Sequence, residues 1–223
     1  ALALGCTVFP GGVGQTEQQL QVIAELAPDG YAGTPSFLQI ILERADAAAV
    51  PVHSLRKALV SGEAFPPALR DALLARGIAG FQMYGTADLG AIAYETAARE
   101  GLVVDEGVLV EIVTPGTGSP VAPGEIGEVV VTALANADYP LIRFGTGDLS
   151  YFTDEPCPCG RTSPRLVKIV GRADQMTKVK GLFVHPNQVE EVRKKFPALG
   201  HSQIVVGVET DGDGLCLGSD RLD

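Results

Sequence analysis

The clearest fold signal lies in residues 56–85, which read RKALVSGEAFPPALRDALLARGIAGFQMYG. The short apolar run at 56–60 predicts a strand that leads into a glycine-containing turn. Residues 66–77 have the spacing and the terminal glycine that are typical of a helix, and residues 80–85 predict a second strand. Strand, loop, helix and strand in this order predict an α/β sheet, in which ligands bind at the carboxyl ends of the strands.

Two more helices are predicted upstream of this unit. Residues 15–26 place apolar side chains close to helical spacing and end at the breaker sequence APDG. The second helix begins at Pro35, because Thr34 is a suitable N-cap and proline favours the first helical position. The first third of the chain is therefore predicted to alternate helices and strands.

From residue 91 onward the composition becomes typical of β-structure. Runs rich in Val, Ile and Tyr are separated by Pro- and Gly-containing turns, and strands are predicted at 91–96, 108–113, 125–134 and 139–144. These strands predict a curled antiparallel sheet appended to the α/β part. The predicted fold class is therefore mixed α/β (α+β), with an α/β sheet, a curled antiparallel β subdomain and the start of a small α+β domain.

A domain boundary is predicted at residues 172–174, where the pattern changes again. Residues 1–172 form the predicted large domain, and residues 173–223 contain short strands, a charged helix beginning near Pro186 and a terminal hairpin. One helix and about two strands are too little to bury a core, because independent domains rarely have fewer than about 40 residues. We therefore expect the small domain to be incomplete.

Composition limits the possible functions. The formal net charge is -10 over 223 residues, which argues against sequence-independent nucleic-acid binding because phosphates are neutralised by clustered Lys and Arg. No apolar run has the roughly 18 residues of a membrane span, and the N-terminal ALALGCTVFPGG has no basic leader. The four cysteines are too sparse for a disulfide framework. We therefore expect a soluble, cytoplasmic protein that does not bind membranes.

A second informative stretch, LIRFGTGDLS at 141–150, places an acid directly after two glycines. Gly145 and Gly147 predict a tight turn at which the backbone can approach a ligand. A carboxylate accepts hydrogen bonds from the two adjacent hydroxyls of a ribose, as the acid of dinucleotide sites does. Asp148 is therefore a candidate ribose-binding residue. The alternative is an aspartate that caps an ordinary turn, where Asp and Gly are common.

Several motifs follow one another along the chain: SGEAFPP, MYGTADLG, PGEIGEVVVT, LIRFGTGDL, CPCGR, GRADQMTKVKG and HPNQVEEV. Together they resemble the adenylate-forming (AMP-binding) enzyme superfamily, and specifically its phenylacetate-coenzyme A ligase branch, over nearly the whole chain. The resemblance implies a ligase that forms an acyl-adenylate and pyrophosphate from ATP and an aryl or acyl acid, and then a coenzyme A thioester. It also implies ATP or AMP, Mg²⁺ and coenzyme A as ligands, and a large multi-sheet domain followed by a small mobile one.

The resemblance implies a nucleotide site that combines three motifs with an arginine at the domain boundary. In this pattern Tyr84 stacks on adenine, Asp148 binds the ribose and Arg172 contacts ribose and phosphate. The residues implied in nucleotide binding are Ser61, Gly62, Glu63, Tyr84, Gly85, Thr86, Asp148 and Arg172.

The same resemblance implies Thr86 and Asp88 as catalytic residues, with Asp88 as a ligand of Mg²⁺, which accepts one or two carboxylates. The chain departs from the family pattern at two positions. Ala87 stands where a hydroxyl residue is usual, and Gly145 stands where the family has an arginine. Ordinary structural roles remain open as alternatives: Tyr84 as a buried aromatic at a strand end, Asp88 as a cap, and SGE as a strand-to-helix turn.

Further roles follow from the resemblance near the two ends of the chain. Asp174 matches the hinge of the small domain, and Gly11 and Gly12 match a segment that lines the acyl pocket, with a simple turn as the alternative. The resemblance also implies a hairpin that faces coenzyme A and contains Lys178, Lys180 and Gly181. The alternative is that this hairpin is a solvated basic surface.

The CPCG sequence at 157–160 offers two thiolates, whereas a structural zinc site uses four ligands. Relatives in this branch can complete such a site with a Cys and a His, and the matching positions here are Thr96 and Val103. We therefore expect no zinc, and we expect Cys157 and Cys159 to remain thiols in a reducing compartment.

The family's phosphate loop is expected before residue 1, and its catalytic lysine is expected after residue 223. Because preorganised charge provides much of the rate in phosphoryl chemistry, we expect these 223 residues alone to be nearly inert as a ligase. The alternative function is a non-catalytic nucleotide- or acyl-binding protein derived from such a ligase. The sequence leaves open which acid is used and which oligomeric state is formed.

Overall fold

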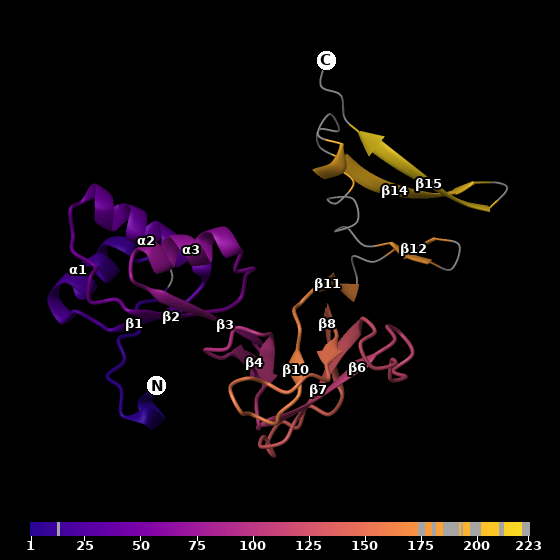
Figure 1. Ribbon diagram of the computed structural model, residues 1–223, viewed down its shortest axis with the longest axis horizontal. Coiled ribbons are helices and arrows are strands. Elements are labelled where there is room, and N and C mark those ends of the chain that lie inside the picture. Colours follow the sequence, from indigo (N-terminus) through magenta and orange to yellow (C-terminus); the bar gives the residue numbers. More distant parts are fainter. Residues whose placement is uncertain are drawn as a thin grey trace. The chain divides into compact units, whose positions relative to one another are not determined.

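The computed structural model describes residues 1–12 and 14–173, and the backbone of short segments beyond them at 177–179, 182–184, 192, 194–196, 202–209 and 212–219. The chain forms two compact units, residues 1–102 and 103–223 (Figure 1). The predicted hinge residue Asp174 lies outside the described residues, and the division into 1–172 and 173–223 stays a prediction.

The first unit packs three helices against one face of a sheet (Figure 1). Its strands lie in chain order, with the first three parallel and the fourth antiparallel: β1 (Gly30–Gly33), β2 (Lys57–Val60), β3 (Ala79–Thr86) and β4 (Gly90–Glu95). The helices are α1 (Thr16–Leu26), α2 (Pro35–Ala47) and α3 (Pro67–Ala75), and a 3-10 turn covers Leu2–Leu4. The predicted α/β arrangement is confirmed.

The core of the first unit follows from the two periodicities of helix and strand. In β2, Ala58 and Val60 are buried, whereas Lys57 and Leu59, which alternate with them, are exposed. The buried residues of α2 recur at helical spacing, and they are Pro35, Leu38, Ile41, Leu42 and Ala45. Fully burying an aliphatic side chain contributes about 1.5–3 kcal/mol, so this face of α2 holds the helix on the sheet.

The start of α2 is fixed as its sequence predicts. The hydroxyl oxygen of Thr34 accepts a hydrogen bond from the backbone N–H of Phe37 at 3.3 Å, and Pro35 occupies the first helical position. The cap satisfies one of the donors that a helix N-terminus leaves unpaired. In contrast, α1 begins without a side-chain cap from Gln15.

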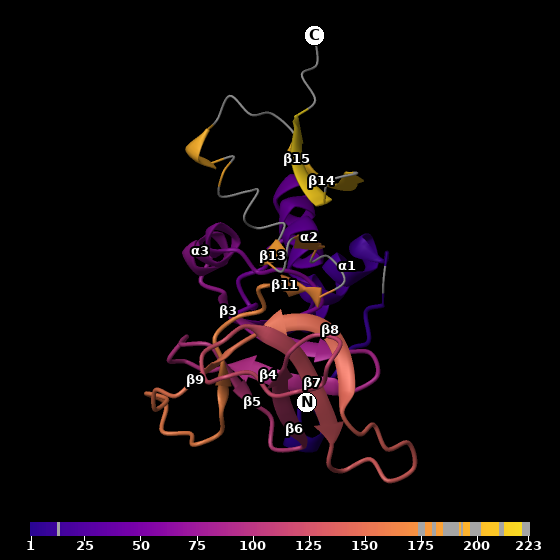
Figure 2. The same ribbon diagram turned by 90° about the vertical axis from the view of Figure 1, so that its right-hand side faces the viewer.

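The second unit contains an antiparallel sheet in the order β11-β8-β7-β6 (Figure 2). Its strands are β6 (Val108–Val113), β7 (Gly127–Ala133), β8 (Phe144–Ser150) and β11 (Gly171–Arg172). Shorter strands are β5 (Leu102–Val104), which begins at the limit of the unit, and the antiparallel pair β9 (Phe152–Thr153) and β10 (Arg165–Leu166). Two hairpins follow, β12 (Thr177–Val179) with β13 (Leu182–Val184), and β14 (Ser202–Glu209) with β15 (Gly212–Ser219). The start of the charged helix predicted near Pro186 lies outside the described residues, but residues 192, 194 and 195 are helical, and the N–H of Phe196 donates to the carbonyl of Val192 at 2.9 Å.

The strand predicted at 139–144 is wrong, because β8 begins only at Phe144 and continues to Ser150. Pro140 has no N–H to donate to a ladder, and Arg143 adopts a positive φ of 50°. The guanidinium of Arg143 instead donates to the carboxylate of Glu111 at 3.0 Å and to the carbonyl of Gly118 at 2.8 Å. The apolar run before β8 is therefore a connection, and the glycine-rich residues after it form the strand.

We expect Thr34→Ala to lower the free energy of unfolding by about 1 kcal/mol, because the N–H of Phe37 loses its acceptor. Thr34→Ser is the matched control, since serine keeps the hydroxyl and is an equally good cap. Chemical denaturation followed by circular dichroism measures both variants. Equal stability of the alanine and serine variants would contradict the capping role.

Candidate functional site

The SGE loop follows β2 at the carboxyl end of a parallel strand. The N–H of Ser61 donates to the carbonyl of Gly33 at 3.1 Å. The carboxylate of Glu63 accepts from the hydroxyl of Ser36 at 2.9 Å and from the N–H of Ser36 at 3.3 Å. Glu63 therefore lies at the N-terminus of α2, where the helix dipole favours an anion. The loop is therefore anchored to the end of β1 and to the start of α2.

Glu63 also acts on a neighbouring phenol. The hydroxyl of Tyr31 donates to the carbonyl of Thr34 at 3.1 Å. Burial raises the pKa of Tyr31 above its ordinary value of 10.0, and the negative charge of Glu63 raises this pKa further. The neutral phenol thus contributes stability that is present below about pH 10 and lost as the pH rises through the folded-state pKa.

The MYGT motif lies at an irregularity between β3 and β4. Tyr84 is paired with Ala93 and Gly85 with Ala91, so Ile92 is an extra residue in β4. A Cβ atom on Gly85 would lie 2.2 Å from the carbonyl oxygen of Gly90, so the position requires glycine. Bulges of this kind are frequent beside functional sites because they redirect side chains.

The side chains of this motif differ in accessibility. Tyr84 is buried, with 8% of its surface exposed. The hydroxyl of Thr86 accepts from the N–H of Leu89 at 3.1 Å and thereby closes a turn. Asp88 is exposed within that turn. Because β2 and β3 are parallel neighbours, the structure brings the SGE loop and the Tyr84–Asp88 segment to the same edge of the first unit's sheet.

The GTGD motif forms a bulge inside β8, and the tight turn predicted there is wrong. Glu128 pairs with Leu149 and Val130 with Gly145, so Val129 of β7 faces three residues of β8. Gly147 adopts a φ of +73°, a value that favours glycine. Cross-strand pairing continues on both sides of the bulge.

Two residues that sequence reasoning missed hold this bulge. The hydroxyl of Thr146 donates to the carbonyl of Val129 at 2.9 Å and accepts from the N–H of Asp148 at 3.1 Å. The carboxylate of Glu128 accepts from the N–H of Gly147 at 3.3 Å. Both residues lie within quoted motifs, but the role of Glu128 depends on a cross-strand contact that the sequence does not display.

The carboxylate of Glu128 also explains why residue 145 is a glycine. A Cβ atom on Gly145 would lie 2.8 Å from Oε1 of Glu128. The place that a larger side chain would need is therefore occupied by a residue that stabilises the bulge.

Asp148 and Arg172 are brought together across β8 and β11. They are directly paired in the register of the two strands, and the Arg172 guanidinium lies 3.2 Å from Oδ1 of Asp148. A Cβ atom on Gly147 would lie 2.7 Å from Nη2 of Arg172, so the glycine also makes room for the arginine. A cation and an acid thus stand side by side at a redirected strand, where they can meet a phosphate and the hydroxyls of a sugar.

In the described structure, the remaining predicted site residues belong neither to the edge formed by the SGE loop and Tyr84–Asp88 nor to the pair of Asp148 and Arg172. The side-chain amide of Gln19 donates to the carbonyl of Gly12 at 2.9 Å, and a Cβ atom on Gly11 would lie 2.7 Å from the same side chain. The two glycines thus pack on α1. The backbone of Lys178 lies in β12, and Lys180 and Gly181 lie outside the described residues.

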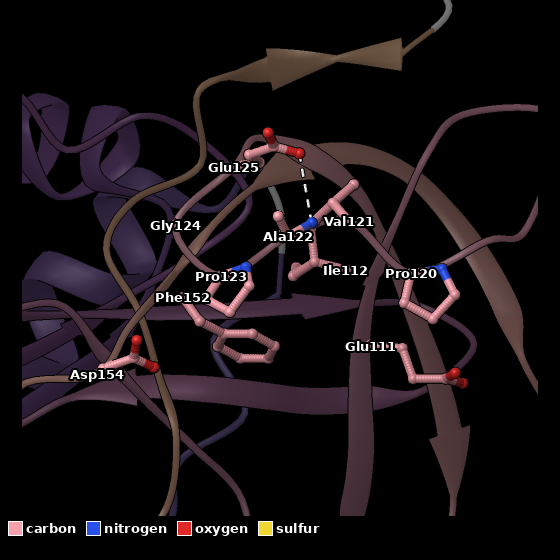
Figure 3. A pocket seen from close by; sticks show the side chains of 10 residues that line it. All are labelled: Glu111, Ile112, Pro120, Val121, Ala122, Pro123, Gly124, Glu125, Phe152 and Asp154. Atoms are coloured by element: carbon pink, nitrogen blue, oxygen red, sulfur yellow. Dashed lines mark hydrogen bonds between the residues drawn. The ribbon is translucent and has the colours of Figure 1, made fainter.

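A pocket of about 290 Å³ in the second unit contains none of the predicted site residues (Figure 3). Phe152 and Pro123 both line it, and the carboxylate of Glu125 accepts from the N–H of Ala122 at 3.3 Å (Figure 3). Its lining is Glu111, Ile112, Pro120, Val121, Ala122, Pro123, Gly124, Glu125, Phe152 and Asp154.

The described residues contain neither a metal-binding cluster nor a helix that could cross a membrane. Among these residues, no group of three or more His, Cys, Asp or Glu side chains could hold a metal ion. None of the helices that the structure describes is long and apolar enough to cross a membrane.

A family model described as AMP-binding enzyme matches residues 1–137. The chain belongs to the AMP-binding enzyme family. It is 36% identical over 214 residues to a phenylacetate-coenzyme A ligase of Thermus thermophilus, covering 92% of this chain and 48% of that protein. It is 36% identical over 226 residues to the phenylacetate-coenzyme A ligase of Escherichia coli, covering 96% and 50%.

Solved structures agree with this assignment. A 2-hydroxyisobutyryl-CoA ligase in complex with 2-HIB-AMP and CoA matches with a TM-score of 0.76 and 26% identity, over 87% of this chain and 48% of that one. An anthranilate CoA ligase, with 20% identity and a TM-score of 0.64 over 95% and 43% of the two chains, shares the fold. The predicted family and branch are thereby confirmed, and the chain spans about half the length of the curated relatives it matches.

We expect Glu63→Gln to lower the pKa of Tyr31 because the neighbouring negative charge is removed, but not to bring it down to its ordinary value, because burial remains. NMR titration of protein with ¹³C-labelled tyrosine measures this pKa, and Tyr31→Phe assigns the signal. An unchanged or higher Tyr31 pKa in Glu63→Gln would contradict the placement of the carboxylate.

Proposed function

We propose that this chain is part of an acyl- or aryl-coenzyme A ligase that joins ATP and a carboxylic acid into an acyl-adenylate and then forms the coenzyme A thioester. Family membership and the phenylacetate-coenzyme A ligases among its relatives support the proposal. The observation that carries it is the pair of Asp148 and Arg172 beside the β8 bulge. An aryl acid such as phenylacetate is the proposed substrate, and the cytoplasm is the proposed compartment.

In this proposal Asp148 binds the ribose of ATP. Its ionised carboxylate accepts hydrogen bonds from two adjacent hydroxyls, and the hydrogen bond from its own N–H to Thr146 holds the backbone in place. Arg172 has a planar array of N–H donors suited to phosphate oxygens. When the nucleotide binds, Arg172 turns part of this array from Asp148 to ribose and phosphate.

The first unit supplies the other proposed contacts. The SGE loop and the Tyr84–Thr86 segment are proposed to border the adenine, mainly through backbone groups, since Tyr84 is buried. Asp88 is the proposed ligand of Mg²⁺, because its carboxylate is exposed and Mg²⁺ prefers oxygen ligands shared with phosphate and water. Bound Mg²⁺ would offset negative charge on the phosphates.

Further roles are proposed for residues in the N-terminal segment and in the segment that follows β11. Asp174 is the proposed hinge between the two half-reactions, since a loop between domains can absorb a change in backbone dihedral angles. Lys178, Lys180 and Gly181 are proposed to face coenzyme A, and Gly11 and Gly12 to border the acyl group.

We expect Asp148→Ala to weaken AMP binding to this chain by about 1–3 kcal/mol, the usual cost of losing a charged hydrogen-bond partner. Isothermal titration calorimetry with AMP and Mg²⁺ measures the effect. Asp154→Ala is the control, because Asp154 is an exposed acid of the same unit outside the proposed site. The ribose role of Asp148 fails if the two variants bind AMP equally well.

We expect Thr146→Val to weaken AMP binding less than Asp148→Ala does, because the bulge loses the hydrogen bonds that the hydroxyl makes with Val129 and Asp148, while the Asp148 carboxylate remains. Thr146→Ser keeps the hydroxyl and should bind AMP like the unchanged chain. The same titration measures both variants, and circular dichroism shows whether each is folded. Equal affinities of folded valine and serine variants would rule out a positioning role for Thr146.

A further inference from the structure

Two cysteines lie side by side in the turn that joins β9 to β10. The Sγ atoms of Cys157 and Cys159 are 2.8 Å apart. The N–H of Gly160 donates to the carbonyl of Cys157 at 2.9 Å and closes the turn around them. A disulfide bond has a length of about 2.05 Å, so the two sulfur atoms need to approach by less than 1 Å to bond.

The backbone on the N-terminal side of this turn is held by a buried cation. The guanidinium of Arg165, which is 3% exposed, donates to the carbonyl of Glu155 at 2.7 Å and to that of Pro156 at 3.4 Å. Pro158, between the two cysteines, has a restricted φ. Much of the entropy cost of bringing the two thiols together is therefore already met by folding, which favours a reaction between them over reactions with separate molecules.

The two thiols differ in access to solvent. Cys157 is buried, with 8% of its surface exposed, whereas Cys159 is partly exposed. A small oxidant therefore reaches Cys159 first, and Cys157 is the adjacent thiol that can attack next. In the described part of the chain no third Cys, His, Asp or Glu combines with them into a metal-binding group, and tetrahedral zinc sites use four ligands.

We propose that Cys157 and Cys159 are a reversible dithiol–disulfide pair that is oxidised by low-molecular-weight disulfides such as oxidised glutathione. The thiolate of Cys159 attacks one sulfur of the oxidant and forms a mixed disulfide with it, while the other sulfur of the oxidant leaves as a thiolate and takes up a proton. The thiolate of Cys157 then attacks Sγ of Cys159 and displaces the second thiolate. Two protein thiols are oxidised to one disulfide, and one small disulfide is reduced to two thiols.

The test uses the folded chain with Cys6→Ser and Cys216→Ser, so that Cys157 and Cys159 are the two cysteines that remain. After treatment with oxidised glutathione and alkylation with iodoacetamide, trypsin releases a peptide from Phe144 to Arg161 that contains both cysteines. We expect this peptide to be unalkylated and lighter by two hydrogen atoms. Treatment with dithiothreitol before alkylation should restore two alkylated cysteines.

Single substitutions and unfolding distinguish disulfide formation between Cys157 and Cys159 from independent oxidation of each thiol. With Cys157→Ser, the reaction should stop at one glutathione on Cys159, and with Cys159→Ser, modification of the buried Cys157 should be slower. In the chain that keeps both cysteines, ring closure should be slower in urea, where the turn is lost. A peptide carrying two glutathiones or two alkyl groups after oxidation would overturn the proposal, as would equal rates of closure in the folded and unfolded chain.

Discussion

The hydroxyl of Thr146 ties the bulge of β8 to β7, and the position of Asp148 depends on this link. The two strands are paired at Gly127 with Ser150 and at Val131 with Phe144. Counted from one pair to the other, β8 contributes seven residues and β7 contributes five. Side chains alternate between the two faces of a strand. One extra residue in β8 would move the following side chains to the opposite face of the sheet, whereas two extra residues leave them on the same face. Leu149 therefore remains buried while the residues before it are displaced from the regular ladder.

Each unit contains a bulge at a motif that was predicted to belong to the site. In each unit a motif with an acid of proposed function follows or contains a bulge, and in each the bulge contains a glycine that other residues could not easily replace. At Gly85 a backbone carbonyl occupies the place of a side chain, and at Gly147 the positive φ favours glycine. Such irregularities cost ladder hydrogen bonds, which are regained through side chains such as Thr146 and Glu128. This explains why polar residues inside these strands are structural partners of the candidate site.

The elements that the sequence predicted well are those set by neighbouring residues. Thr34 and Pro35 specify the start of α2 through contacts within one helical turn, and the β2-α3-β3 unit follows from local periodicity. The errors concern contacts between distant segments. The run LIRF is apolar enough for a strand, but β8 is defined by pairing with β7. Likewise, the attachment of Glu63 to the N-terminus of α2 joins residues 27 positions apart, and no local pattern reveals it.

The ion pair between Asp148 and Arg172 is well suited to a site that must exchange partners. The side chain of Arg172 is 46% exposed and that of Asp148 is 18% exposed. Pairs near solvent contribute about 0–1 kcal/mol, whereas breaking a buried pair costs about 3–5 kcal/mol. In the proposed ligase, a nucleotide can therefore replace one of these contacts at little cost. The ion pair thus orders Asp148 and Arg172 before the nucleotide arrives, and its exposure to solvent leaves both groups available to bind the nucleotide.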